Sequence, residues 1–148
     1  MDSKSILILI IFGLMIKTSE LYHFLKDIDQ DFSPYLSSKV VLSEYVEKIQ
    51  NHAELIVDKT VALRGIVVLY CNDVVNFKAY ISLVGVRSEF RGMGIARKMM
   101  VEAINKAQDN GMKVIGIHSN NEIALKLYKS LGFVTKEFGE REYLEMKL

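Results

Sequence analysis

Two segments in the first third of the chain place apolar residues three and four positions apart, a spacing that predicts amphipathic helices. Leu21, Phe24, Leu25, Ile28 and Phe32 recur at this spacing, so the first helix is expected from Thr18 to about Gln30. Pro34 and neighbouring serines interrupt it. A second, shorter helix is expected to open at Ser43, because serine is a good N-cap residue, and to turn Val46 and Ile49 inward.

The middle of the chain changes to shorter apolar runs rich in β-branched residues, which predict strands. Three such runs follow one another at residues 53–58, 61–70 and 77–86, and polar turns join them. Strands joined by short turns can pair antiparallel, so we expect an antiparallel meander. Gly65 lies inside the second strand and is a candidate for a β-bulge.

Helices alternate with strands in the second half of the chain. Two adjacent apolar rows predict a helix from Gly94 to about Asn110, and Gly111 supplies its stop. Residues 113–119 predict a strand. Ser119 and Glu122 then fit the S-x-x-E capping box of a further helix.

That further helix is expected to end at Gly132, in the C′ position, with Phe133 placed to pack back on it. Residues 132–137 and 141–148 predict the final strands. The order of elements predicts an α/β fold with a mixed sheet, formed by one domain over residues 1–148.

Residues 6–16 form an apolar run that follows Lys4, as in the first part of a signal peptide. These 11 residues are too few to cross a bilayer as a helix, which takes about 20, and no small-residue cleavage motif follows them. We expect a buried strand, for which the isoleucine-rich composition is suited, and no stable membrane association. An exposed strand here would be a natural homodimer contact. A membrane-associated protein anchored through this run is the alternative.

Charge and residue counts exclude several classes of partner. The net charge of +1 argues against nucleic acid, because nucleic-acid binders normally carry a strong basic excess. Cys71 is the single cysteine, so no internal disulfide can form, and a reducing, cytoplasmic location is expected. His23, His52 and His118 are scattered along the chain, so we expect no metal.

Candidate chemistry gathers at residues 87–98, where Arg87, Arg91, Arg97 and Lys98 surround two glycines. The G-x-G-x-x-G dinucleotide fingerprint fails, because Arg97 stands where a small residue is needed. What remains is a glycine turn that leaves a strand and enters a helix, whose free amides can hold an anion. The alternative is a solvated basic helix start with a glycine turn made for packing.

Two motifs in order resemble those of the GNAT-type N-acetyltransferase superfamily. Arg91, Gly94 and Ala96 are similar to the family's [QR]-x-x-G-x-[GA] pyrophosphate loop. Residues 121–134 resemble its second signature, N-x-x-A-x-x-L-Y-x-x-x-G-F. The resemblance covers about residues 77–148, with the CoA-binding motifs within 77–134, and implies a GNAT-like, mostly antiparallel central sheet flanked by helices.

The resemblance implies that acetyl-CoA is the co-substrate and that an amine on a small molecule, sugar or peptide accepts the acetyl group. Backbone amides would hold the pyrophosphate, helped by the charges of Arg91, Arg97 and Lys98; these amides belong to Gly92, Met93, Gly94, Ile95, Ala96 and Arg97. The strand that contains Val84 and Val86 would pair with the pantetheine arm, and an amide near Val86 would polarise the thioester carbonyl.

The same resemblance assigns roles to two further residues and provides no general base at the family's usual positions. Asn121 would hydrogen-bond the pantetheine, and Tyr128 would protonate the departing thiolate; the alternative for Tyr128 is an ordinary core aromatic on a helix. Many relatives use a carboxylate base at places that Tyr80 and Gly116 occupy here.

His118 shares the strand face of Gly116 and is the candidate base, because its ordinary pKa lies near 6.5. A histidine that merely ends the strand, Asp73 as a weaker base, and a water chain are the alternatives. Without an obvious base, a non-catalytic acyl-CoA-binding or sensing domain remains a second hypothesis.

Overall fold

A computed structural model describes residues 2–4 and 16–148, and its elements follow the expected order. The helices are α2 (Thr18–Ile28), α3 (Leu42–His52), α4 (Ile95–Asp109) and α5 (Glu122–Leu131). The strands are β1 (Glu54–Lys59), β2 (Leu63–Asp73), β3 (Lys78–Val86), β4 (Val114–Ser119), β5 (Val134–Glu137) and β6 (Glu142–Lys147). The strand expected at 6–16 lies outside the described residues, apart from Ile16. None of the described helices is long and apolar enough to cross a membrane.

The six strands form one sheet in the order β1-β2-β3-β4-β6-β5. β1, β2 and β3 pair antiparallel, as expected for the meander. β4 pairs parallel with β3 and antiparallel with β6, because α4 carries the chain across the sheet between β3 and β4. The sheet is therefore mixed and mostly antiparallel, which confirms the expected α/β class.

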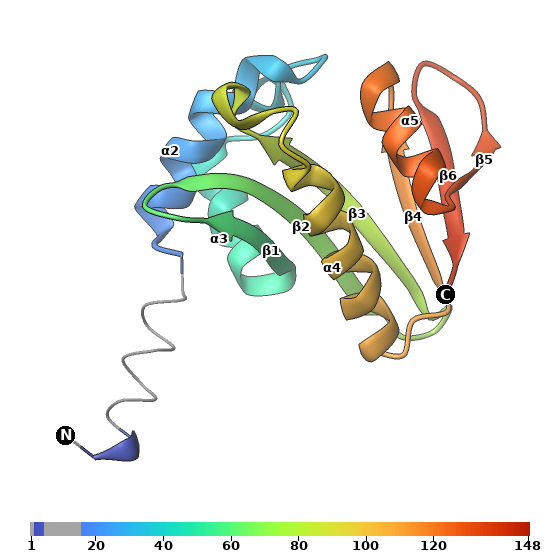
Figure 1. The fold of residues 1–148 in the computed structure, drawn as a ribbon, viewed down its shortest axis with the longest axis horizontal. Helices are drawn as coiled ribbons and strands as arrows, with labels where there is room; N and C mark the ends of the chain where they lie inside the picture. Colours follow the sequence, from blue (N-terminus) through green and yellow to red (C-terminus); the bar gives the residue numbers. More distant parts are fainter. Residues whose placement is uncertain (1, 5–15) are drawn as a thin grey trace.

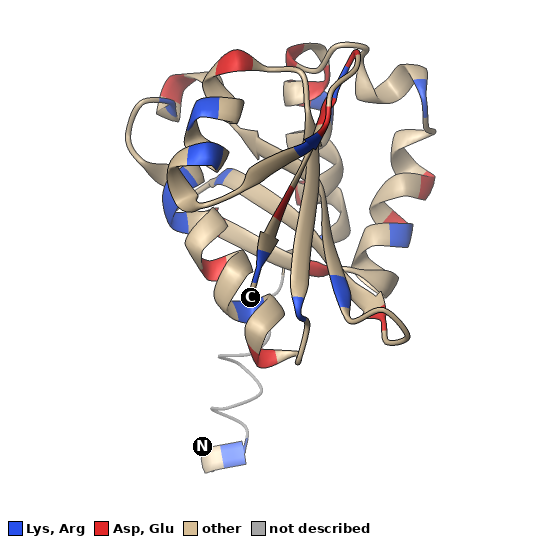
Figure 2. Ribbon diagram, turned by 90° about the vertical axis from the view of Figure 1, so that its right-hand side faces the viewer, with Lys and Arg blue, Asp and Glu red and all other residues tan. Residues whose placement is uncertain are grey.

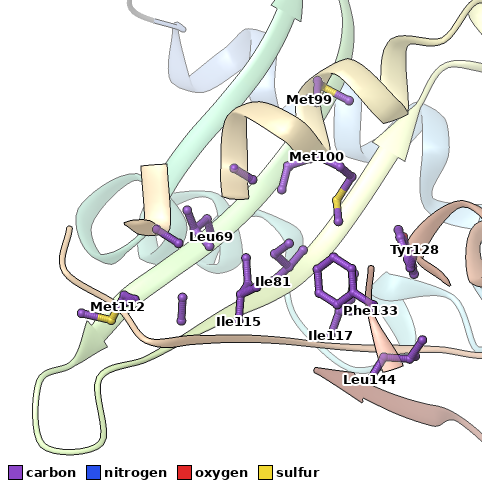
Figure 3. Packing of buried hydrophobic residues seen from close by; sticks show 14 of the residues in the cluster. Leu69, Ile81, Met99, Met100, Met112, Ile115, Ile117, Tyr128, Phe133 and Leu144 are labelled. Carbon is purple, nitrogen blue, oxygen red and sulfur yellow. The ribbon is translucent and has the colours of Figure 1, made fainter. Parts of the chain in front are cut away.

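Two hydrophobic layers sandwich this sheet. α4 and α5 pack on one face around Met99, Met100, Ile115 and Ile117 (Figure 3). α2 and α3 pack on the opposite face, mainly over the first strands, as Figure 1 shows. Because side chains alternate along a strand, neighbouring residues of β4 face different layers.

Two expected helix starts are wrong. α3 begins at Leu42, so Ser43 lies inside its first turn, and Val41 in the cap position makes no side-chain bond. This start buries Val46 and Ile49 completely, and packing outweighs the capping preference of serine. At α5 the N-cap is Asn121, because Ser119 is still the buried last residue of β4.

Irregular pairing appears where Gly65 predicted a bulge. The β1–β2 register passes from Asp58–Gly65 to Lys59–Leu63, which leaves Arg64 as the extra residue. A Cβ at Gly65 would lie 2.8 Å from Cε of Met99 and 3.2 Å from the carbonyl oxygen of Gly85, so the Met99 side chain would have to shift. The glycine thus lets α4 approach β2 closely.

A second irregularity separates β3 from β4. The β2–β3 register passes from Leu69–Ile81 to Val68–Leu83, so Ser82 is an extra residue in β3. The parallel pairing of β3 with β4 ends at Ile81–Ile117, immediately before this residue. Bulges bend the strand that carries them, and the two strands part beyond this point, as Figure 1 shows.

Candidate acetyl-CoA and acceptor site

A glycine turn connects the end of β3 to the start of α4, as the sequence predicted. Gly92 and Gly94 have φ angles of 77° and 76°, in the left-handed region that favours glycine. A Cβ on either would meet nothing within 4 Å, so the space beside this loop is open. α4 has no side-chain cap and no acid in its first turn, which leaves its first amides available to an anion. The loop therefore fits a pyrophosphate.

The basic side chains around this turn are partly neutralised by acids from the first third of the chain. The guanidinium of Arg91 donates to Asp31 at 2.6 Å and to the carbonyl of Val86 at 3.1 Å. Arg87 pairs in the same way with Asp27. These acids stand 60 residues away in sequence, so the local pattern could not reveal them. Acidic and basic positions are interspersed over the ribbon (Figure 2).

The remaining predicted donor-site residues lie at the end of β3, in the glycine turn and first turn of α4, and at the start of α5. Val84 and Val86 come after the bulge, on the part of β3 without β4 pairing, and pack against the α4 and α5 layer. Arg97 donates to Ser130 of α5 at 2.7 Å. Met93, Ala96 and Lys98 accompany the glycine turn and the first turn of α4. Asn121 is exposed, and its side-chain oxygen accepts from the amide of Ala124 at 2.9 Å, which fixes the start of α5.

Tyr128 lies on the α4 and α5 face of the sheet. It is 4 % exposed, and its ring centre is 6.1 Å from that of Phe133, which packs back as expected (Figure 3). Burial raises the pKa of Tyr128 to about 12, so the hydroxyl keeps its proton throughout the neutral range. Among the described residues the hydroxyl has no hydrogen-bond partner.

His118 lies on the opposite face. Tyr80 and Gly116 are partners in the β3–β4 register, and His118 follows Gly116 on the same side of β4. A hydrogen bond of 2.8 Å joins the Tyr80 hydroxyl to Nδ1 of His118. Burial, and secondly the charge of Arg141, lowers the pKa of His118, so the imidazole is neutral at pH 7 and able to accept a proton.

Sequence reasoning missed two residues that accompany His118. Tyr80 was noted only as the occupant of a carboxylate position, because its contact with His118 depends on the pairing of β3 with β4. Tyr143 follows no motif, and its ring centre lies 4.6 Å from that of His118. Asp73, the weaker candidate, is not brought near: its carboxylate accepts from Asn76 at the far end of β3.

Several curated proteins that are similar to this chain are N-acetyltransferases. An N-alpha-acetyltransferase 30 of Schizosaccharomyces pombe is 28% identical over 83% of this chain and 86% of its own length. The corresponding protein of Saccharomyces cerevisiae is 36% identical over 47% of this chain and 41% of its length. GCN5-related N-acetyltransferase 4 of Arabidopsis thaliana is 46% identical over 37% of the chain, which spans only 20% of that protein. The chain thus covers less than half of the latter two relatives.

Solved structures share the fold at low sequence identity. Ard1 from Thermoplasma volcanium superposes with a TM-score of 0.76 at 14% identity, over 90% of this chain and 94% of the other. A GNAT family acetyltransferase from Elizabethkingia anophelis, solved with acetyl-CoA bound, has a TM-score of 0.61 at 22% identity, over 71% and 82%. The model of the Acetyltransferase (GNAT) family matches residues 21–133. The chain therefore belongs to the GNAT acetyltransferase family, as its two motifs indicated.

Proposed function

We propose that the protein is an acetyl-CoA-dependent N-acetyltransferase that acetylates the α-amino group of a peptide or protein. Membership of the GNAT family supports the reaction type. The relatives called N-alpha-acetyltransferase 30 support the acceptor class, because the fission yeast protein matches most of this chain. The observation that carries the proposal is the hydrogen-bonded Tyr80–His118 pair, which lies where the pairing of β3 with β4 ends, while Tyr128 is buried on the other face of the sheet.

Acetyl-CoA, when bound, supplies an acetyl group activated as a thioester. The turn amides from Gly92 to Arg97 are assigned to its pyrophosphate, with charge from Arg91, Arg97 and Lys98. The stretch of β3 beyond its pairing with β4, which holds Val84 and Val86, is assigned to the pantetheine arm, and the exposed amide group of Asn121 to its far side.

His118 receives the proton that the acceptor must lose. An amine arrives largely as an ammonium ion, and its nitrogen has no free electron pair until that proton leaves. The nitrogen then forms a bond to the thioester carbonyl carbon, and the bond from that carbon to sulfur breaks. In the tautomer that serves as base, Nδ1 of His118 carries the hydrogen and donates it to the hydroxyl oxygen of Tyr80, so Nε2 takes the proton from the acceptor and passes it to water.

Tyr128 serves the leaving group from the other face. The departing sulfur carries a negative charge, and the protonated hydroxyl of Tyr128 donates its hydrogen to it. A second proton released by the acceptor nitrogen restores the tyrosine, so the products are the acetylated amine and the free thiol of CoA. An amide near Val86 would stabilise the negative charge on the carbonyl oxygen.

An acceptor screen tests the proposal. Purified full chain is given acetyl-CoA with four amines: a peptide with a free α-amine, the same peptide acetylated at its N-terminus but carrying a lysine, spermidine and glucosamine. Release of free thiol is then followed. The proposal predicts release with the first peptide and a rate at least about tenfold lower with the others, since positioning contributes much of the rate.

Two outcomes would contradict the proposal. Thiol release with spermidine or glucosamine alone would move the acceptor from a peptide to a small molecule or sugar. Tight binding of acetyl-CoA without thiol release would replace the enzyme with an acyl-CoA-binding domain. We also propose a cytoplasmic location, which fractionation of the untagged protein checks.

A further inference from the structure

We propose that Tyr143 is a positioning residue for His118. Its ring stacks on the imidazole and holds it in the orientation in which Nδ1 meets Tyr80 and Nε2 is left for the acceptor amine. This inference rests on the proposed function, because it takes His118 as the base.

The register of the sheet brings the three rings together. His118 of β4 and Tyr143 of β6 are direct antiparallel partners, so their side chains leave the sheet on the same face. Their ring centres are 4.6 Å apart and the planes are inclined by 33°. On the other side, Tyr80 meets the imidazole edge-on, with centres 5.8 Å apart. The imidazole therefore lies between a stacked ring and a hydrogen-bonded one.

Tyr143 is itself held at its hydroxyl end. The hydroxyl donates to Oε1 of Glu145 at 2.8 Å, and Nζ of Lys78 donates to the same oxygen at 2.8 Å. The same ammonium lies 4.8 Å from the centre of the Tyr143 ring. The hydrogen bond from Lys78 is the main cause that lowers the pKa of Glu145, so this carboxylate stays ionised at neutral pH and keeps its hold on the tyrosine.

Gly116 leaves the space in which the tyrosine ring lies. A Cβ at this position would stand 2.5 Å from the hydroxyl oxygen of Tyr143 and 3.0 Å from Cε2. Gly116 is not among the glycines with positive φ, so the backbone conformation itself does not call for glycine. The structure instead explains the glycine at 116 by the space that the ring of Tyr143 requires. The position at which many relatives carry a carboxylate is thus a glycine here, because the ring of Tyr143 occupies the space that a side chain at 116 would need.

The contacts of Tyr143 and Gly116 predict what each substitution at these two positions removes. Leucine at 143 removes the stacked ring and its bond to Glu145, whereas phenylalanine keeps the ring and loses only the bond. Alanine at 116 pushes the ring away from His118 while leaving every partner present. Once the ring is gone, the added methyl group of Gly116→Ala has nothing to displace, so its effect vanishes in the double variant.

The test compares Tyr143→Leu, Gly116→Ala and the double variant, with Tyr143→Phe as the conservative change. Phe138→Leu is the matched control, because Phe138 is 82% exposed between β5 and β6. For each full-length variant that gives a folded thermal transition, kcat and both KM values are measured with acetyl-CoA and the free-amine peptide. The ¹⁵N signals of the His118 imidazole are recorded without substrate, because they report its tautomer.

Tyr143→Leu and Gly116→Ala should each lower kcat by about tenfold or more, with the KM for acetyl-CoA within about twofold, since a misplaced base loses rate rather than donor binding. The double variant should match Tyr143→Leu alone. In all three the imidazole should change from one dominant tautomer to a mixture. Tyr143→Phe should keep kcat within about threefold, and Phe138→Leu should change nothing.

Unchanged imidazole signals in Tyr143→Leu, or effects that multiply in the double variant, would overturn the positioning role while leaving the proposed function intact. Absence of thiol release from the unsubstituted protein would instead refute the proposed function. The imidazole spectra, which need no turnover, would then decide the positioning role by themselves.

Discussion

The two faces of the sheet differ in how they are built around the gap between β3 and β4. The face under α4 and α5 is apolar and closed, and it buries Tyr128 beside Phe133. On the other face, the half-buried His118 of β4 lies between the rings of Tyr80 from β3 and Tyr143 from β6. We call the face under α4 and α5 the closed face and the face that carries His118 the open face. Residues of the closed face lie in motifs that can be read along the sequence, whereas strand pairing brings the residues of the open face together. The residues proposed for donor binding therefore lie in local sequence motifs, whereas those proposed for proton transfer are brought together by tertiary structure.

The largest effect is expected from His118→Ala on the open face. Removal of a general base that takes the acceptor proton should lower kcat by about 10²- to 10³-fold, with the KM for acetyl-CoA within about twofold. Steady-state thiol release measures both values. His52→Ala, an exposed histidine at the end of α3, is the control and should keep its rate. Equal kcat values for the two variants would remove His118 from the reaction.

A smaller loss of rate is expected from Tyr128→Phe on the closed face. The ring and its packing against Phe133 remain, so only the proton offered to the departing sulfur is lost, and kcat should fall by about 10- to 100-fold. Tyr22→Phe, a half-buried tyrosine of α2, should leave kcat unchanged. An equal kcat in Tyr128→Phe and the unsubstituted protein would make this tyrosine a core residue only.

Gly94→Ala separates donor binding from catalysis. Gly94 and Gly111 both have φ of 76° and open space around a Cβ, so alanine strains each backbone by about 1 kcal/mol or slightly more. Thermal unfolding should therefore shift similarly in the two variants. Only Gly94→Ala distorts the loop assigned to the pyrophosphate, and its KM for acetyl-CoA should rise about 5- to 10-fold. A similar rise in Gly111→Ala would attribute the effect to stability.

The smallest expected effect is a shift in the pH at which activity begins to fall on the acid side of the pH profile, called here the acid limb. Burial and Arg141 lower the pKa of His118, so the neutral, proton-accepting form persists to a pH below 6.5. Activity should be present above that pKa and fall about tenfold per pH unit beneath it. In the pH profile of kcat/KM for acetyl-CoA, the acid limb of the unsubstituted protein should lie below pH 6.5. The His118→Ala variant should show no such limb. A limb above pH 6.5 would contradict the geometry.

The sequence was sufficient for the fold and for much of the closed face. Gly92 and Gly94, which need a left-handed backbone, lie in a short motif directly before α4. Tyr128 lies in a second short motif. Within each motif the structure depends on residues that are close in sequence. The expected capping box failed because Ser119 belongs to β4, and burial in a strand outweighed a local capping preference.

The open face could not be read in this way. Tyr80 and His118 are 38 residues apart, and Arg91 and Asp31 are 60 apart, so each contact depends on which strands and loops become neighbours. The bulge at Ser82 has no sequence mark either, although it reverses the face to which the following residues of β3 point. Gly116 was visible as a missing carboxylate, but its cause, the ring of Tyr143, lies on another strand.

The most direct measurement is thiol release from acetyl-CoA with the free-amine peptide by the unsubstituted protein, His118→Ala and Tyr128→Phe, side by side. If the two faces act on one reaction at the gap between β3 and β4, both variants will bind acetyl-CoA normally and lose kcat, by about 10²-fold or more and about 10-fold or more respectively. Normal acetyl-CoA binding with full turnover in both variants would contradict the account.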